Sequence, residues 1–180
     1  MIVREAANED VNTVLEVVRR AFNRGTEAVL VRTLLSDPSA EPRLSLVAIE
    51  SASGKAVGHA LFTAATIEAA ERTVPAAILA PLAVVPEAQR KGWGGRLISE
   101  GLYRLSRAGV EILFVLGEPK YYARHGFAPA APWGLEAPFP IPAKHAGAWM
   151  AQGLRDNVAG AVTGKVRCAE ALNKLEYWKE

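Results

Sequence analysis

The sequence predicts an α/β (α+β) fold in which helices flank a central mixed, mostly antiparallel sheet. Extended runs at Leu44–Glu50, Ala56–Glu68 and Ala76–Val85 follow one another through short turns, a spacing typical of an antiparallel meander. A glycine-rich turn, an amphipathic helix over Trp93–Ala108 and a wholly apolar strand over Ile112–Leu116 come next. This order predicts a right-handed crossover that makes the last strand parallel to the strand before the helix.

Two helices are expected ahead of the meander, after a short strand that begins at Ile2. Asn8 is expected to cap the first helix, whose apolar residues recur at helical spacing: Val11, Val14, Leu15, Val18 and Phe22. Thr26 is expected to cap the second helix, and Asp37-Pro38 to end it.

The end of the chain is less regular. Pro119 and Gly126 bracket a predicted short helix. The proline-rich stretch 129–142 is expected to be a surface loop, followed by strands within 146–154 and 160–167. Pro81 cannot donate a ladder hydrogen bond, so it predicts a bulge or an unpaired edge in the third strand of the meander.

Composition restricts the class of protein. At 180 residues, with half of them hydrophobic, the chain is expected to form a single domain over residues 1–180. A net charge of +2 does not argue for nucleic acid, and Cys168 is the single cysteine, which excludes an internal disulfide. The three histidines lack metal-ligand spacing. With neither a signal peptide nor a long apolar run, we expect a cytoplasmic protein with no metal, nucleic-acid or membrane partner.

The glycine-rich turn is the strongest functional signal. Residues 84–96 read VVPEAQRKGWGGR, so a helix begins where side chains cover its N-terminus poorly. Free N–H groups and the helix dipole favour a phosphate or pyrophosphate there, and Arg90, Lys91 and Arg96 add positive charge. The alternative, that the glycines only make a tight turn, stays open at this point.

The motif series resembles the GNAT superfamily of acyl-CoA-dependent N-acetyltransferases. The resemblance is carried by Gln89-x-x-Gly92-x-Gly94 within PLAVVPEAQRKGWGGRL, and by YYARHGF about thirty residues later. The order of elements extends the likeness from Ile2 to about Leu172. It implies a GNAT fold whose sheet splays between strands 4 and 5, with residues 131–180 supplying an acceptor-side loop and C-terminal strands.

The resemblance also implies acetyl-CoA as co-substrate. Its pantetheine arm would lie in the gap between 82–85 and 112–116, and its pyrophosphate on the glycine turn. The cofactor-binding residues so implied are Leu82, Ala83, Val84, Gln89, Arg90, Lys91, Gly92, Trp93, Gly94, Gly95 and Arg96.

The implied reaction is direct attack of a primary amine, from a small molecule or a peptide, on the acetyl thioester. Tyr122 stands at the family's general-acid position, against the alternative of a merely packed aromatic ring, and Tyr121 is expected to be structural. The strand before the turn lacks the family's Glu base, and Gly117-Glu118-Pro119 replaces an Asn. The base is left open between Glu27, Glu68, a histidine and water.

Two other functions compete with this one. A non-catalytic acyl-CoA sensor would explain the missing carboxylate and Asn, whereas a phosphatase or kinase lacks the Gly-x-x-x-x-Gly-Lys signature. The acceptor is expected to be selected by 22–27, 68–74 and 128–149, where Trp133, Phe139 and Trp149 could line a pocket. The acyl length and a homodimer are also open.

Overall fold

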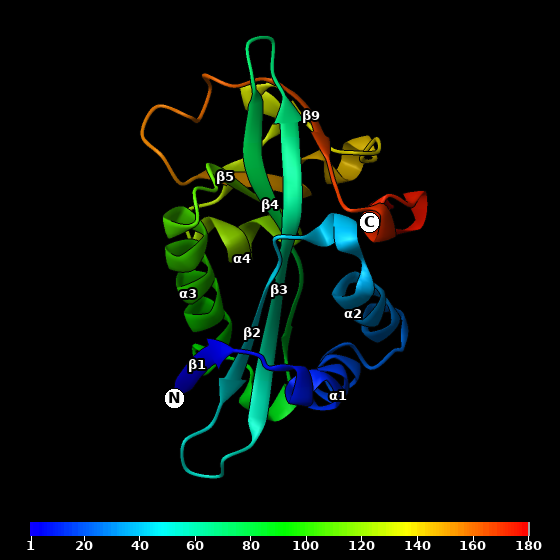
Figure 1. Ribbon diagram of the computed structural model, residues 1–180, viewed down its shortest axis with the longest axis vertical. Coiled ribbons are helices and arrows are strands. Elements are labelled where there is room, and N and C mark those ends of the chain that lie inside the picture. The colour runs from blue at the N-terminus through cyan, green and yellow to red at the C-terminus, as the bar shows by residue number, and fades with distance from the viewer. Residues whose placement is uncertain (180) are drawn as a thin grey trace.

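A long hairpin of β3 (Ala56–Glu68) and β4 (Thr73–Val84) extends along the whole length of the molecule (Figure 1). The computed structural model describes residues 1–179; Glu180, the last residue of the predicted domain, lies outside them. The remaining strands are β1 (Ile2–Glu5), β2 (Leu44–Ile49), β5 (Ile112–Leu116), β6 (Ala128–Pro129), β7 (Leu135–Glu136), β8 (Trp149–Gly153) and β9 (Gly164–Arg167).

The main sheet has the order β1-β2-β3-β4-β5-β8-β6. Only β4 and β5 are parallel along this path, and every other neighbour is antiparallel. β9 pairs with the far end of β3 and, in parallel, with β7. The predicted mixed, mostly antiparallel sheet and its parallel crossover are therefore confirmed.

Helices cover both faces of this sheet. In Figure 1, α1 (Val11–Phe22) and α2 (Thr26–Ser36) lie on one side of the hairpin, whereas α3 (Trp93–Arg107) lies on the other. α4 (Pro119–Ala123) follows β5. Short 3-10 turns occupy Asn8–Asp10, Pro38–Ala40, Pro86–Ala88, Ala131–Trp133, Ala143–Ala148, Glu170–Leu172 and Leu175–Trp178.

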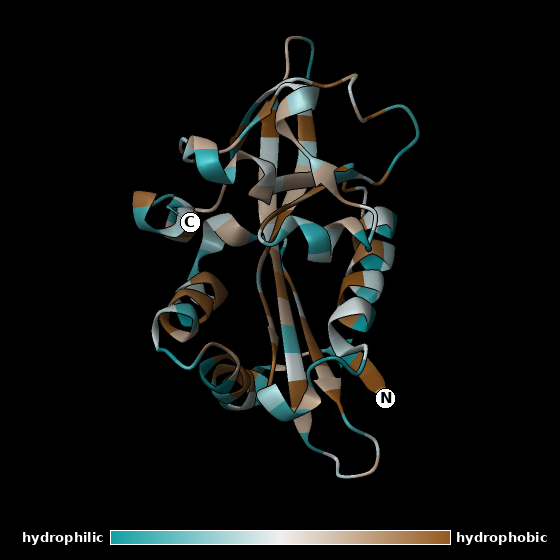
Figure 2. Ribbon diagram, turned by 180° about the vertical axis from the view of Figure 1, so that it is seen from behind, coloured by the Kyte–Doolittle hydropathy of each residue, from teal (hydrophilic) through white to brown (hydrophobic). Residues whose placement is uncertain are grey.

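The core follows the predicted apolar faces. Hydrophobic colour follows the central strands in Figure 2 and alternates with hydrophilic colour along the helices. α1 buries Val14, Leu15, Val17 and Val18, and each such side chain contributes about 1.5–3 kcal/mol. α3 approaches β3 closely at Gly101, where a Cβ would lie 2.1 Å from Cζ of buried Phe62. A glycine there lets the helix lie directly on the sheet.

The helix starts differ from expectation. Asn8 opens a 3-10 turn and is not the cap of α1, which follows Asp10 and has no side-chain cap bond. The carboxylate of Asp10 instead accepts the Ala7 amide at 2.7 Å. Asp10 can do so because Arg4 holds it through an ion pair of 2.7 Å, which lowers the pKa of Asp10 to about 2. Likewise Gly25, and not Thr26, occupies the N-cap position of α2. Thr26 is the first residue of that helix, and no side chain caps it.

β4 is irregular at the predicted place. Ala60 pairs with Leu82 while Phe62 pairs with Leu79, so two residues of β4, Ala80 and Pro81, face one residue of β3. This is a bulge, and it bends the strand. β5 pairs with β4 only over 76–79. The two parallel strands thus separate after Leu79, which confirms the predicted splay. The gap was expected along the whole of 112–116, but residues 112–115 are paired with β4, so it opens only beyond Val115.

The C-terminal part closes the same core. The ring of Trp149 stacks on Phe114 of β5 with centroids 4.8 Å apart, and Trp178 packs edge-on against it at 5.5 Å. Trp178 is 2% exposed and donates its Nε1–H to the Leu172 carbonyl at 2.9 Å. The two predicted C-terminal strands form, but shorter than expected, and the proline-rich stretch carries the short strands β6 and β7.

Candidate active site

A cavity of about 1100 Å³ opens where β4 and β5 separate. One wall is the outer end of β4 with the glycine turn and the start of α3. A second wall is the end of β5 with α4, and a third comes from the α1–α2 junction. The C-terminal segment contributes Leu172 and residues 176–179. Parts of the chain far apart in sequence therefore share one site.

The backbone of β4 presents polar groups to this cavity. The amide of Val85 donates to the Val57 carbonyl at 3.0 Å. Because antiparallel hydrogen bonds alternate, the backbone groups of Ala83 also face β3, and those of Leu82 and Val84 face the opposite, open edge. The Val84 carbonyl accepts Nε2–H of Gln89 at 3.1 Å. Gln89 thereby ties the turn to the strand.

The glycine turn has the backbone of a candidate anion site. Arg90 has φ of 60° and Gly92 has φ of 87°, and positive-φ residues in a turn can direct neighbouring amides to one side, as in anion-binding nests. Gly92 precedes α3, whose first amides have no partner within the helix. A positive φ explains why a glycine occupies position 92, since no described atom lies within 4 Å of an added Cβ.

The next glycines are needed for a different reason. A Cβ at Gly94 would lie 2.2 Å from the Tyr121 hydroxyl, and one at Gly95 would lie 2.9 Å from Cε1 of His125. The turn therefore packs directly on α4. Tyr121 lines the cavity, half-buried, and burial raises the pKa of its hydroxyl. Tyr121 therefore packs against the glycine turn, as expected for a structural residue, and it also lines the cavity.

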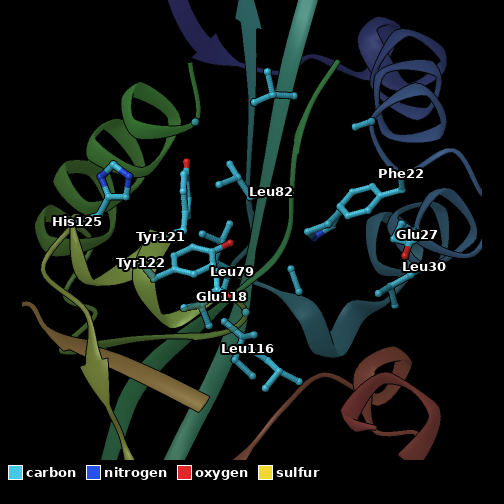
Figure 3. Close-up of a pocket in the computed structure, with 18 of the residues that line it drawn as sticks. Phe22, Glu27, Leu30, Leu79, Leu82, Leu116, Glu118, Tyr121, Tyr122 and His125 are labelled. Carbon is cyan, nitrogen blue, oxygen red and sulfur yellow. The ribbon is translucent and has the colours of Figure 1, made fainter. Parts of the chain in front are cut away.

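Tyr122 stands on the α4 wall and points into the cavity (Figure 3). Glu118 caps the short helix by accepting the Lys120 amide at 3.2 Å. The Tyr122 ring lies against Gly117, where a Cβ would be 2.5 Å from Cε2. Edge contacts with Tyr121 at 5.0 Å and Phe127 at 5.6 Å fix the ring on both sides. The hydroxyl is thus presented by a rigid support.

Glu27 faces the cavity from the opposite wall, in the first turn of α2 (Figure 3). Its side chain is 15% exposed, and Oε1 forms an ion pair with Nε of Arg24 at 2.8 Å. Oε2 is buried and has no hydrogen-bond partner within residues 1–179. A buried carboxylate oxygen without a donor is unfavourable, so this atom marks a place for a donor from outside the chain.

Comparison with known proteins assigns the family. The profile described as an acetyltransferase (GNAT) domain matches residues 2–130. The chain belongs to the GNAT acetyltransferase family. It is 48% identical over 162 residues to YjhQ of Escherichia coli K12, named an uncharacterized N-acetyltransferase, a match that covers 89% of this chain and 88% of YjhQ.

Two solved structures resemble the whole GNAT chain. The crystal structure of the E. coli GNAT N-acetyltransferase YhbS in complex with CoA superposes with a TM-score of 0.84 at 29% identity, covering 96% of this chain and 92% of YhbS. A GNAT acetyltransferase from Brucella melitensis in complex with acetyl-CoA superposes with a TM-score of 0.72 at 27% identity, covering 95% and 97%.

Most of the residues predicted from the GNAT motif meet at this cavity. The lining includes Leu82, Val84, Gln89, Arg90, Gly92, Trp93, Gly94 and Gly95, with Tyr122 and Glu27. Ala83 is 1% exposed, and its backbone faces β3. Lys91 and Arg96 are exposed beside the turn, outside the described lining.

Two other candidates for a base, Glu68 and His59, lie away from the cavity. Glu68 ends β3 at the far tip of the hairpin and pairs with Arg167 at 3.0 Å. His59 is fully buried, with Nε2 at 3.0 Å from Oγ of Ser45, and burial lowers its pKa to about 3. Burial also raises the pKa of the Cys168 thiol to about 11. Neither His59 nor Cys168 belongs to the described lining.

Sequence reasoning missed several residues of the lining. Glu118, Arg124 and His125 line the cavity, as do residues 176–179, whereas Arg24 falls within the expected acceptor-side stretch 22–27. The place of His125 in YYARHGF is a signal that could have found it, but no pattern within 170–179 indicates that this segment returns to the site. The predicted aromatic residues Trp133, Phe139 and Trp149 are absent from the described lining, and Trp149 serves the core instead.

Metal-binding clusters and membrane-spanning helices are both absent from the described chain. Over residues 1–179, no group of three His, Cys, Asp or Glu side chains is arranged to hold a metal ion. In the same part of the chain, every helix is too short or too polar to cross a bilayer.

Proposed function

We propose that this GNAT protein transfers the acetyl group of acetyl-CoA to a primary amine of a small molecule or peptide. One observation supports it most: a single cavity holds an unpaired strand edge, an anion-binding turn, a fixed tyrosine hydroxyl and an unpartnered carboxylate oxygen. The first two features suit the parts of a CoA thioester, and the last two suit proton transfer.

The cavity fits CoA by its chemistry. Pyrophosphate would bind at the amides from Gly92 to Gly95, with Arg90 and Arg124 adding positive charge. The pantetheine amides would pair with the backbone of Leu82 and Val84, which already faces the opening. An added strand of this kind is how extended amide chains bind an open sheet edge. Acetyl-CoA supplies the acetyl thioester when bound.

The acetyl group is transferred directly to the amine, and residues of the chain carry the protons. The amine nitrogen bonds to the thioester carbon while the C–S bond breaks and its electron pair remains on sulfur. Tyr122 protonates that sulfur, and Glu27 takes the first proton that the ammonium must lose before attack. The second nitrogen proton returns to Tyr122 through solvent, and the proton on Glu27 leaves to water. Glu27 is the base we propose, because its buried Oε2 lacks a donor, whereas Glu68 lies at the far hairpin tip and His125 packs against Gly95 of the glycine turn.

Thiol release from acetyl-CoA across a panel of amines tests the proposal. Tyr122→Phe is expected to lower kcat about 10²–10⁴-fold, the usual contribution of a positioned acid, with CoA affinity retained. Tyr103→Phe is the matched control, since Tyr103 is 60% exposed on α3, outside the described lining.

The result also separates the enzyme from a sensor. CoA at about 100 times its Kd should raise the free energy of unfolding by about 2.7 kcal/mol in either case. Stabilisation by CoA with no amine-dependent thiol release, and no effect of Tyr122→Phe, would replace the transferase by an acyl-CoA-binding sensor. Stabilisation by ATP but not by CoA would favour a phosphate-transfer function.

A further inference from the structure

The acceptor side of the cavity is largely apolar. Away from the glycine turn, apolar lining comes from Phe22 and Leu30 at the α1–α2 junction and from Leu172 with Tyr177 near the C-terminus. Figure 3 shows Phe22 and Leu30 on the same side as Glu27, across from Tyr122. These surfaces are not used by the CoA contacts proposed above.

The C-terminal part of this wall is held firmly. Trp178 is buried against Trp149, and its Nε1–H donates to the Leu172 carbonyl. Ser39 and Asp37 add two further anchors, since Oγ of Ser39 accepts the Glu170 amide at 2.8 Å and Oδ2 of Asp37 accepts the Ala171 amide at 2.9 Å. A wall fixed in this way can select the shape of an acceptor.

Polar groups on this side are few and differ in accessibility. Arg24 is 64% exposed and already paired with Glu27, and the lining residues Thr26, Glu176 and Lys179 are exposed as well. Water therefore solvates the polar groups of all four. The inward Oε2 of Glu27 is different, because it is buried and lacks a donor from the described chain.

We propose that the acceptor is a primary amine on an apolar alkyl or aromatic body, with its ammonium on Glu27 and its body against Phe22, Leu30 and Tyr177. This rests on the proposed acetyl transfer. The ammonium supplies the missing donor to Oε2, and the apolar body matches the apolar wall. A carboxylate next to the amine would face Glu27 at like charge, and the hydroxyls of an amino sugar would lose water without partners.

Matched acceptors test the substrate class. We expect kcat/KM for 2-phenylethylamine to exceed that for phenylalanine, which adds only a carboxylate, and that for glucosamine by about 10–200-fold. Glu27→Gln is expected to lower kcat/KM for 2-phenylethylamine about 100-fold or more while the Kd of CoA is unchanged. Glu16→Gln is the control, because Glu16 is also an i,i+3 partner of an arginine, but is 61% exposed on α1.

A second variant tests the C-terminal wall. Tyr177→Ala should raise KM for 2-phenylethylamine about tenfold and leave KM for methylamine unchanged, since methylamine has no body to contact the ring. Tyr103→Ala serves as its control. Equal use of phenylalanine or glucosamine, or an unchanged KM in Tyr177→Ala, would overturn the acceptor class while acetyl transfer stands. Transfer to no amine at all would overturn both proposals.

Discussion

The contact between Gly94 and Tyr121 makes a quantitative prediction. In Gly94→Ala the new Cβ would lie 2.2 Å from the Tyr121 hydroxyl but 3.5 Å from Cζ, an ordinary contact distance. Tyr121 cannot turn away freely, since Tyr122 lies 5.0 Å and His125 5.1 Å from its ring centroid. Overpacking of this kind costs about 1–3 kcal/mol, against a helix-propensity gain of at most about 1 kcal/mol. We expect a net destabilisation of about 1–2 kcal/mol.

Removing the hydroxyl should remove the clash. In Tyr121→Phe the atom nearest to the new Cβ is gone, so Gly94→Ala in that background should be neutral or stabilising by up to about 1 kcal/mol. Urea unfolding of the wild type, both single variants and the double variant gives the coupling free energy, which we expect to be about 1–3 kcal/mol. An equal cost of Gly94→Ala with tyrosine and with phenylalanine at position 121 would refute the reasoning.

Two more predictions follow from the same structure. Gly92→Ala should cost about 1–2 kcal/mol of stability, because its φ of 87° is unfavourable for a residue with a Cβ. The same variant should weaken CoA binding. Gly147→Ala is the control and should be mild by comparison, since no described atom lies within 4 Å of the new Cβ. The depressed pKa of His59, about 3 against 6.5, means that the unfolded chain binds its proton first, so stability present above pH 6.5 is lost on acidification. Between pH 7 and pH 5 this loss is about 2 kcal/mol; urea unfolding at both values should show it, and His59→Gln should lack that part of the loss even if it is less stable throughout.

Local patterns were sufficient for much of the fold. The strands Ala56–Glu68 and Ile112–Leu116 have the predicted bounds, and α3 ends one residue earlier than expected. Alternation, helical spacing and glycine position are properties of neighbouring residues, so they can be recognised without tertiary contacts. Pro81 belongs to the same class, because a missing N–H in a strand requires an irregular ladder wherever the strand packs.

Caps and site walls were harder to predict. Asn8 is a good cap by composition, but α1 begins only after Asp10, whose carboxylate pairs with Arg4 and accepts the Ala7 amide. Gly94 reads as a site for close ligand approach, yet its missing Cβ accommodates the Tyr121 hydroxyl. Several residues near each position could have filled these roles. Which one does so depends on contacts with another element of the fold, and a local pattern does not contain those contacts.

The sequence alone determined the strands, the helices and the glycine turn, because each is encoded within a few consecutive residues. The placing of Tyr122 near that turn followed from the likeness of YYARHGF to the GNAT motif, and the fold brings both segments to one cavity. Tertiary structure decided the acceptor side. The sequence left the base open between Glu27, Glu68, a histidine and water. Only packing buries one oxygen of Glu27 in the cavity while Glu68 pairs with Arg167 at the hairpin tip. Likewise Tyr177 reaches the cavity because Trp178 packs on Trp149, a contact between segments that no local pattern relates.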